Sequence, residues 1–171
     1  MKIGLIVLQS MDGYIAKDEG DDLSWGSSDD KVFFKKISTE YGTIVVGRKT
    51  FETLPTAIFK TRKAIVLTRS KKENNNLQNV YFTNGEPKEI IEFAKKLGIE
   101  NLLIAGGAEV YSQFLSSGLV NEIYITIAPI LHGGGTKAFG NINLSLEDYT
   151  LANFFKIGEK EIFIQYQRIN D

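Results

Sequence analysis

Short apolar runs rich in β-branched residues recur along this chain, and segments with helical spacing separate most of them. Continuous apolar character indicates strands that are buried on both faces, as in a parallel sheet covered by helices. The predicted strands of this kind are 3–9, 43–47, 63–68, 79–83 and 101–105. The predicted helices are 29–38, 87–98 and 107–118. This alternation of strands and helices predicts an α/β fold.

The last part of the chain has a different pattern. Two apolar runs, 122–131 and 159–168, have little helix between them, as in an antiparallel pair at the end of a sheet. The length of 171 residues, without a repeat or a linker, predicts one domain over 1–171. We therefore expect a single α/β domain with a mostly parallel central sheet, antiparallel C-terminal strands and helices on both faces.

Composition excludes several classes of function. The formal net charge is −1 and there is no basic block, which argues against nucleic acid as a partner. The chain has no cysteine, and its only histidine, His132, stands before three glycines. Thiolate and histidine-rich metal sites are therefore excluded, and a structural role is favoured for His132.

The sequence also bounds the location of the protein. No segment is apolar over the length that a bilayer requires, and the N-terminus lacks a signal-peptide cleavage pattern. We expect a cytoplasmic protein, either a monomer or a homodimer, that binds a small molecule and neither nucleic acid nor membrane.

Ligands of parallel sheets bind beyond the carboxyl ends of the strands, and three segments lie there. In the first, Gly47 ends a strand and Arg48, Lys49 and Thr50 open a helix. Backbone N–H groups at a helix start, with two cations and a hydroxyl, can bind phosphate. A glycine turn followed by a solvated helix start explains the same residues equally well.

The other two segments are weaker signals. Gly106 and Gly107 join a strand to a helix, which lets a pyrophosphate approach the backbone, although a plain tight turn has the same residues. Thr68, Arg69 and Ser70 end another strand and suit a phosphate monoester or solvent. The Rossmann GxGxxG and the P-loop are both absent from the sequence. Together the three segments indicate a nucleotide with several phosphates.

The stretch LSWGSSDDKVFFKK, residues 23–36, places two adjacent carboxylates between a tryptophan and a pair of aromatics. In one interpretation the acids only stabilise the start of a helix, which is worth at most about 1 kcal/mol. In the other, Asp29 caps the helix while Asp30 faces an apolar pocket and binds a ligand there.

Five motifs, in order along nearly the whole chain, resemble those of the dihydrofolate reductase superfamily. They are WGSSDDKVFF, VVGRKTFETLP, RKAIVLTRS, GGAEVYSQFL and IYITIA. Each motif alone is modest, but five in order with sensible spacing are hard to obtain by chance. The resemblance implies an NADPH-dependent reductase of 7,8-dihydrofolate.

The resemblance also implies the cofactor site. Gly47, Arg48, Lys49 and Thr50 would hold the pyrophosphate, and Thr68, Arg69 and Ser70 the adenosine 2′-phosphate. Gly106 and Gly107, which a cis peptide joins in the family, would allow close approach near the nicotinamide, and Tyr111 would lie against it. Ala108 and Val110 complete the implied cofactor-binding residues.

On the substrate side, the resemblance implies a catalytic group of Asp30, Trp25 and Thr126. Asp30 would accept hydrogen bonds from the 2-amino group and the ring N–H of a pterin, and Thr126 would hydrogen-bond this acid. The implied substrate-binding residues are Leu8, Phe34, Leu54, Arg62 and Ala105. Among these, Phe34 would pack on the pterin ring and Arg62 would bind the glutamate tail of folate.

Other features resemble a sister branch, the reductase of riboflavin biosynthesis, which reduces a ribosylaminopyrimidine phosphate. They are the segments SMDGYIA and APILHGGGTKAF. Ala105 replaces a larger aliphatic residue, Lys31 replaces an apolar one, and Glu109 places a carboxylate in the phosphate-binding turn. The alternative function is therefore a reductase of that branch or a related NADPH-dependent reductase of a small molecule.

Overall fold

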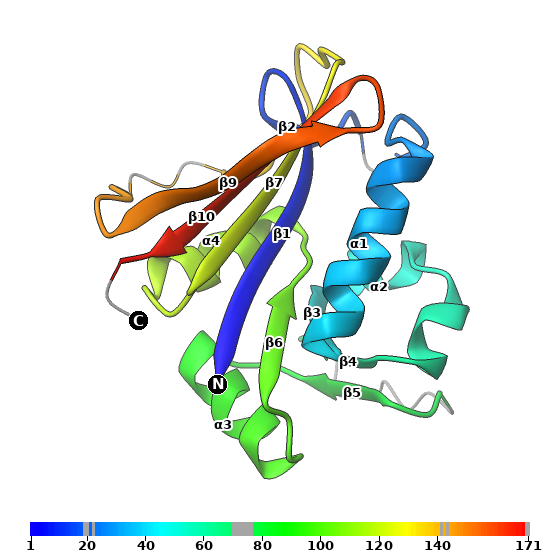
Figure 1. The fold of residues 1–171 in the computed structure, drawn as a ribbon. Helices are drawn as coiled ribbons and strands as arrows, with labels where there is room; N and C mark the ends of the chain where they lie inside the picture. Colours follow the sequence, from blue (N-terminus) through cyan, green and yellow to red (C-terminus); the bar gives the residue numbers. More distant parts are fainter. Residues whose placement is uncertain (19–20, 22, 70–76, 141, 143, 170–171) are drawn as a thin grey trace.

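The computed structural model describes residues 1–18, 21, 23–69, 77–140, 142 and 144–169, and it confirms an α/β domain built on one large sheet (Figure 1). Among these residues, eight strands form the sheet in the order β5-β4-β3-β6-β1-β7-β10-β9, and two short strands, β2 and β8, pair separately. The strands from β5 to β7 are parallel, whereas β10 and β9 are antiparallel. The strands are β1 (Lys2–Ser10), β2 (Tyr14–Ala16), β3 (Thr43–Gly47), β4 (Lys63–Leu67), β5 (Val80–Thr83), β6 (Asn101–Ile104), β7 (Glu122–Ala128), β8 (Thr136–Lys137), β9 (Tyr149–Ile157) and β10 (Glu161–Arg168).

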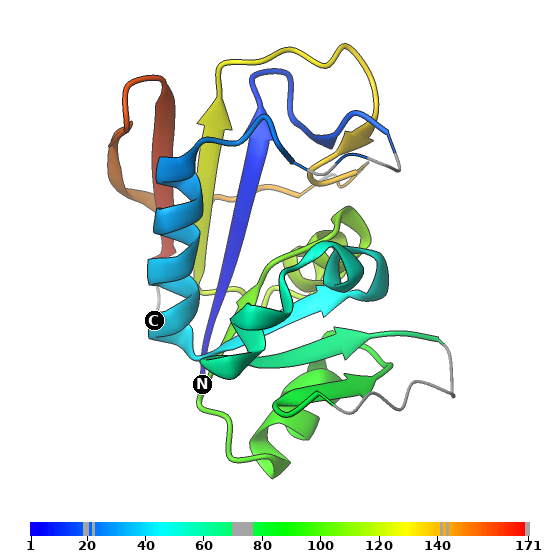
Figure 2. The same cartoon turned by 90° about the vertical axis from the view of Figure 1, so that its right-hand side faces the viewer.

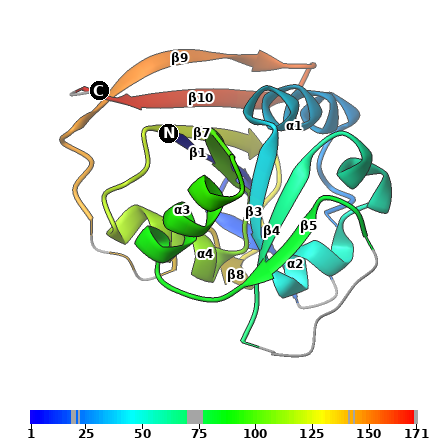
Figure 3. The same ribbon diagram turned by 90° about the horizontal axis from the view of Figure 1, so that it is seen from below.

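Helices cover both faces of the sheet, as expected, because alternate residues of the buried strands point to opposite sides. Helices α3 and α4 lie on one face, and α1 lies on the other (Figure 3). Ile44 and Val46 of β3 pack in the cluster with α1, while Val45 packs in the cluster with α3 and α4. The helices are α1 (Ser28–Tyr41), α2 (Arg48–Thr53), the 3₁₀ turn η1 (Thr56–Lys60), α3 (Pro87–Lys96) and α4 (Ala108–Ser116).

The C-terminal part differs from the expectation in two respects. The strand expected at 122–131 ends at Ala128, and a further strand, β9, precedes β10. β9 forms the edge of the sheet, and most of its side chains are exposed, so its sequence lacks the alternation of a half-buried strand. The two strands form a hairpin whose turn lies next to the start of α1 (Figure 1).

The loops that follow β1 and β7 lie side by side beyond the carboxyl ends of these strands (Figure 2). Asp12 joins the two loops, because its carboxylate accepts hydrogen bonds from the backbone N–H groups of His132 and Gly133 at 3.1 and 2.7 Å. Among the described residues, no helix has the length and apolar character needed to cross a membrane.

Candidate active site

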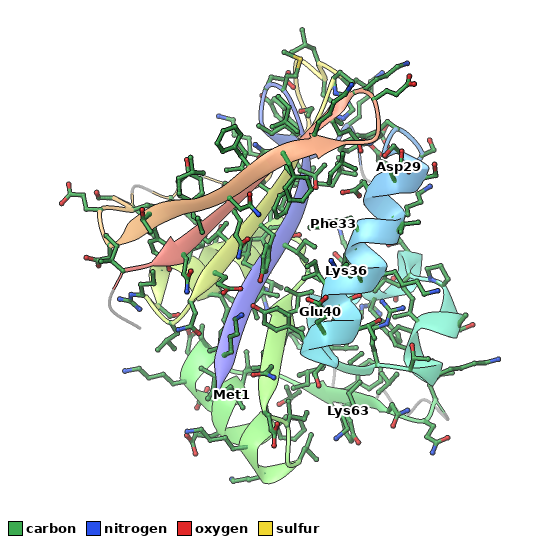
Figure 4. The ribbon with its side chains drawn as sticks, viewed as in Figure 1. Met1, Asp29, Phe33, Lys36, Glu40 and Lys63 are labelled. Carbon is green, nitrogen blue, oxygen red and sulfur yellow. The ribbon has the colours of Figure 1, made fainter. Side chains whose placement is uncertain are left out.

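The site forms around the first turn of α1, beyond the carboxyl ends of β1 and β7. Ser27 is the N-cap of this helix, and its hydroxyl accepts a hydrogen bond from the Asp30 N–H at 3.0 Å. The expectation that Asp29 caps the helix is therefore wrong. Asp29 is exposed on the outer side and packs against Gly158 in the β9–β10 turn (Figure 4). Asp30 faces inward.

Asp30 is a buried carboxyl, with only 8% of its surface exposed. The pKa of Asp30 is raised to about 6, mainly by burial; a hydrogen bond with the Thr126 hydroxyl and the charge of Lys31 oppose this rise, and the carboxylate of Glu161 adds to it. Thr126 is itself buried on β7, opposite Leu8 of β1. The structure thus brings Asp30 and Thr126 together, as the sequence predicts, and gives Asp30 a proton equilibrium near neutral pH.

The predicted apolar substrate residues are partly buried. Phe34, Leu54 and Ala105 pack against the same core cluster on the α1 face of the sheet. Leu8 lies behind Gly26, where a Cβ would approach the Leu8 side chain to 2.6 Å. The neighbouring Phe33 packs edge-on against Phe163 of β10, with ring centroids 4.5 Å apart, and so anchors α1 to the sheet.

Glu161, the first residue of β10, belongs to the site although the sequence analysis did not find it. Only 2% of its surface is exposed, and it accepts hydrogen bonds from the Ser27 N–H at 3.0 Å and the Ser27 hydroxyl at 2.5 Å. The signal that could have found it is the two-residue period of β10, which buries Glu161 and Phe163 on one face.

Arg62 is buried behind α1, just before β4. One of its guanidinium nitrogens donates to the Ser38 hydroxyl at 2.5 Å, and its Nε has no hydrogen-bond partner among the described residues. Burial lowers the pKa of Arg62. The role of Arg62 in binding a glutamate tail stays a prediction.

On the cofactor side, two glycines bring β3 and β6 together. The Gly47 N–H donates to the Gly106 carbonyl at 2.7 Å, and the peptide between Gly106 and Gly107 is cis, as the resemblance implies. A Cβ on Gly107 would lie 3.2 Å from Thr50 Oγ1. The Tyr111 hydroxyl donates to the Ile6 carbonyl at 2.7 Å, and burial raises the pKa of this phenol.

The region around Gly47, Gly106 and Gly107 suits a dinucleotide because two helices begin there. α2 starts directly after Gly47 and α4 directly after Gly107, and neither N-cap residue has a side chain that satisfies the first-turn N–H groups. Such N–H groups bind phosphate oxygens, and the glycines leave room for close approach. The predicted cofactor residues Ala108 and Val110 lie in the first turn of α4.

The predicted 2′-phosphate residues show one unexpected contact. Arg69 follows β4, and its guanidinium forms an ion pair with the Glu109 carboxylate of α4 at 2.6 Å. The two side chains are 88% and 70% exposed. Glu109 therefore points toward Arg69. The third predicted residue, Ser70, lies outside the described residues.

Trp25 lies in the loop between β2 and α1. Its indole Nε1 donates to the Asp21 carboxylate at 3.1 Å, and its ring lies edge-on to His132, with centroids 5.1 Å apart. The contact joins this loop to the one after β7, so His132 has the structural environment that the sequence favours. A cavity of about 510 Å³ borders Trp25 and His132 on the side of Lys17 and Leu131.

Comparisons with known proteins agree with this geometry. The sequence profile described as "Dihydrofolate reductase" matches residues 2–168. The uncharacterized protein YwjB of Bacillus subtilis is 27% identical over 149 residues, which cover 81% of this chain and 82% of that protein.

Two solved structures resemble almost the whole chain. A Shewanella sp. PV-4 protein assigned to riboflavin biosynthesis has a TM-score of 0.82 and 25% identity, covering 98% of this chain and 99% of that one. Dihydrofolate reductase of Enterococcus faecalis, solved with NADP(H), has a TM-score of 0.75 and 25% identity, covering 99% of this chain and 97% of that one.

Proposed function

This chain belongs to the dihydrofolate reductase family and is an NADPH-dependent oxidoreductase, and we propose that it reduces 7,8-dihydrofolate to tetrahydrofolate. The observation that carries the proposal is the buried carboxyl of Asp30, which is hydrogen-bonded to Thr126 and lies near the apolar Phe34. A ribose-phosphate substrate would not need such a group, whereas a pterin offers it two parallel donors.

Asp30 would bind the 2-amino group and the adjacent ring N–H of the pterin, and Thr126 would fix the orientation of the acid. When bound, NADPH supplies the hydride that adds to the carbon of the pterin C=N bond, while the nitrogen gains a proton. The pKa of about 6 keeps part of Asp30 protonated near neutral pH. The hydrogen-bonded pair of acid and pterin can therefore carry the proton that the reduction consumes.

The chain's own residues would hold the two ligands at fixed positions. Gly47 and the start of α2 would bind the pyrophosphate, Arg69 would bind the 2′-phosphate, and the turn at Gly106 and Gly107 would allow close approach of the nicotinamide. Phe34 and Leu54 would pack against the substrate ring and keep water away. Exclusion of water strengthens the contacts of a buried carboxyl with its ligand.

A second candidate is a reductase of the riboflavin branch. It is favoured by the TM-score of 0.82 to the Shewanella protein, which is above that of the Enterococcus dihydrofolate reductase at the same identity. The small side chain of Ala105 also leaves more room beside the site than a larger aliphatic residue would. Under this alternative, the same NADPH site would serve a ribosylaminopyrimidine phosphate.

The test is the loss of NADPH absorbance when the purified protein is mixed with dihydrofolate, for wild type and two matched variants. Asp30→Asn keeps the shape of the buried group but not its proton equilibrium, and we expect kcat/KM to fall by at least about 100-fold. Asp29→Asn, on the exposed neighbour, should remain close to wild type.

Equal activity of Asp30→Asn and wild type would rule out the proposed role of Asp30. Absence of turnover in all three proteins, with NADPH still bound, would favour the second candidate. The ribosylaminopyrimidine phosphate would then be the substrate to test with the same variants.

A further inference from the structure

Glu161 is a second buried carboxylate at the substrate site. It opens β10, where its side chain points to the α1 face of the sheet together with Phe163. Within the described part of the chain, it accepts two hydrogen bonds, both from the N-cap Ser27, through the backbone N–H and the hydroxyl. A buried acid is costly for a fold, and capping one helix does not require it, because Ser27 alone satisfies the N–H of Asp30.

A continuous path of hydrogen bonds leads from Glu161 to Asp30. The Ser27 hydroxyl donates its proton to Glu161 at 2.5 Å, so its lone pairs are free to accept the N–H of Asp30 at 3.0 Å. Glu161 thereby fixes the rotamer of the serine that begins α1. The first turn of the helix, and with it the Asp30 side chain, is held against β10.

Among the described residues, four groups from four elements interact with the Asp30 carboxyl. Thr126 of β7 hydrogen-bonds it, and it interacts electrostatically with Lys31 of α1, Tyr111 of α4 and Glu161 of β10. Lys31 is exposed, so water screens its positive charge, whereas Glu161 is buried and its negative charge is screened far less. Two carboxyls in one apolar region cannot both ionise at low cost.

We propose that Glu161 is a positioning residue for Asp30: it holds the N-cap Ser27, and through Ser27 it fixes the first turn of α1 that carries the acid. The inference rests on the proposed function only in that Asp30 is the acid that binds substrate. It makes the substrate site a pair of carboxylates with different roles. Glu161 hydrogen-bonds Ser27 and does not contact the ligand, whereas Asp30 binds the ligand directly.

The experiment is a pH titration of the Asp30 side-chain carboxyl by ¹³C NMR in the full-length protein without ligands, which needs no substrate. Glu161→Gln removes the charge and keeps an acceptor for Ser27. We expect the Asp30 midpoint to fall by roughly one pH unit from a wild-type pKa of about 6. Glu161→Leu, a second neutral variant of similar size, serves if the glutamine variant does not fold.

Glu122→Gln is the matched control. Glu122 is also buried in β7, but its partners are Tyr41, Tyr124 and Lys2, away from Asp30. This variant should leave the Asp30 midpoint unchanged. An unchanged midpoint in a folded Glu161 variant, or an equal shift in Glu122→Gln, would overturn the inference.

Turnover supplies a separate readout. If protonated Asp30 is required, the fall of kcat with rising pH should begin roughly one pH unit lower in Glu161→Gln, which gives about tenfold lower activity at pH 7.5 and little change at pH 4.5. A purely structural role would lower activity equally at both pH values and would contradict the proposal. If dihydrofolate is not turned over by any variant while the NMR midpoint shifts, the proposed function fails and the inference about Glu161 stands.

Discussion

The two halves of the site are built in opposite ways. The carboxylate half consists of Ser27, Asp30, Thr126 and Glu161, and hydrogen bonds between α1, β7 and β10 hold it together. Asp30, Thr126 and Glu161 are only 2% to 8% exposed. The phosphate half, which consists of Arg48, Lys49, Arg69 and Glu109, is exposed, and Arg69 and Glu109 form an ion pair in solvent.

This difference separates what each half contributes. Burial of a carboxyl shifts its pKa and also destabilises the folded protein. In the carboxylate half, the same burial that adjusts the pKa of Asp30 therefore lowers the free energy of unfolding. An exposed ion pair contributes about 0–1 kcal/mol and is screened by salt. The phosphate half can therefore change its charges with little effect on stability, and we expect its variants to alter cofactor binding alone.

In this comparison of the two halves, the largest expected effect is that of Asp30→Asn on the pH dependence of the free energy of unfolding. Well below the ordinary aspartate pKa of 3.8, Asp30 is protonated in both the folded and the unfolded chain, and at pH 4 about half of it is already ionised in the unfolded chain. As pH rises toward the folded pKa of about 6, the unfolded chain ionises more easily than the buried carboxyl, so folding becomes less favourable. The wild-type protein should lose up to about 3 kcal/mol from this group between pH 4 and pH 7.5, and the asparagine variant should not.

The measurement is urea unfolding of both proteins at the two pH values. The variant should gain about 2–3 kcal/mol relative to wild type on going from pH 4 to pH 7.5. Asp29→Asn, which changes an exposed charge in the same helical turn, should move by at most a few tenths of a kcal/mol. If the free energies of unfolding of the variant and wild type change equally between the two pH values, burial does not raise the pKa of Asp30.

The next effect concerns the glycine turn between the two halves. Gly106 has φ of +112°, and a Cβ there would lie 3.1 Å from the Tyr111 hydroxyl, which is fixed by its bond to the Ile6 carbonyl. Gly106→Ala should lower the free energy of unfolding by about 1–3 kcal/mol and weaken NADPH binding. Thermal unfolding and a fluorescence titration with NADPH measure the two effects.

Gly134→Ala is the control, because a Cβ at Gly134 meets nothing within 4 Å and its φ is not in the left-handed region. It should leave both quantities near wild type. If Gly106→Ala is as stable as this control, the turn is more adaptable than its contacts with Tyr111 indicate.

The sequence predicts the two halves unequally well. The parallel sheet follows from the buried runs, whereas the residues alone left two interpretations of Asp30 open and the family resemblance decided between them. Asp29 was wrongly expected to cap α1, because Ser27 and two acids at one helix start are all good N-terminal residues and only the backbone decides among them.

Long-range contacts explain what the sequence analysis missed. Glu161 lies 134 residues from Ser27, and Glu109 lies 40 residues from Arg69, so local patterns hold no information about either pair. The edge strand β9 was missed for a related reason: its exposed side chains do not alternate, and pairing with β10 defines it.

In the phosphate half, Arg69→Gln should separate the two nicotinamide cofactors. Loss of one charge-assisted contact in solvent should raise the Kd for NADPH by about fivefold to tenfold and leave the Kd for NADH unchanged, because only NADPH carries the 2′-phosphate. Isothermal titration of both cofactors measures this, with Arg168→Gln, which lies at the Gly118 carbonyl, as the control. Equal weakening of both cofactors would place Arg69 at the pyrophosphate.

The smallest expected effect comes from Glu109→Gln. In the free protein, Glu109 occupies the guanidinium of Arg69, so a 2′-phosphate must displace a carboxylate before it binds. The variant should bind NADPH about twofold to threefold more tightly at low salt, and the gain should shrink near 1 M salt, where charges are screened within about 3 Å. Its unfolding free energy should stay within a few tenths of a kcal/mol of wild type.

The tighter NADPH binding expected for Glu109→Gln requires the guanidinium of Arg69, and the double variant Arg69→Gln/Glu109→Gln tests that requirement. If displacement of Glu109 is the cause, the double variant binds NADPH no better than Arg69→Gln alone, and NADH binding is the same in all four proteins. Weaker NADPH binding in Glu109→Gln would mean instead that the carboxylate contacts the cofactor, for example through a ribose hydroxyl. The phosphate half would then resemble the carboxylate half, because one of its acids would recognise a ligand directly.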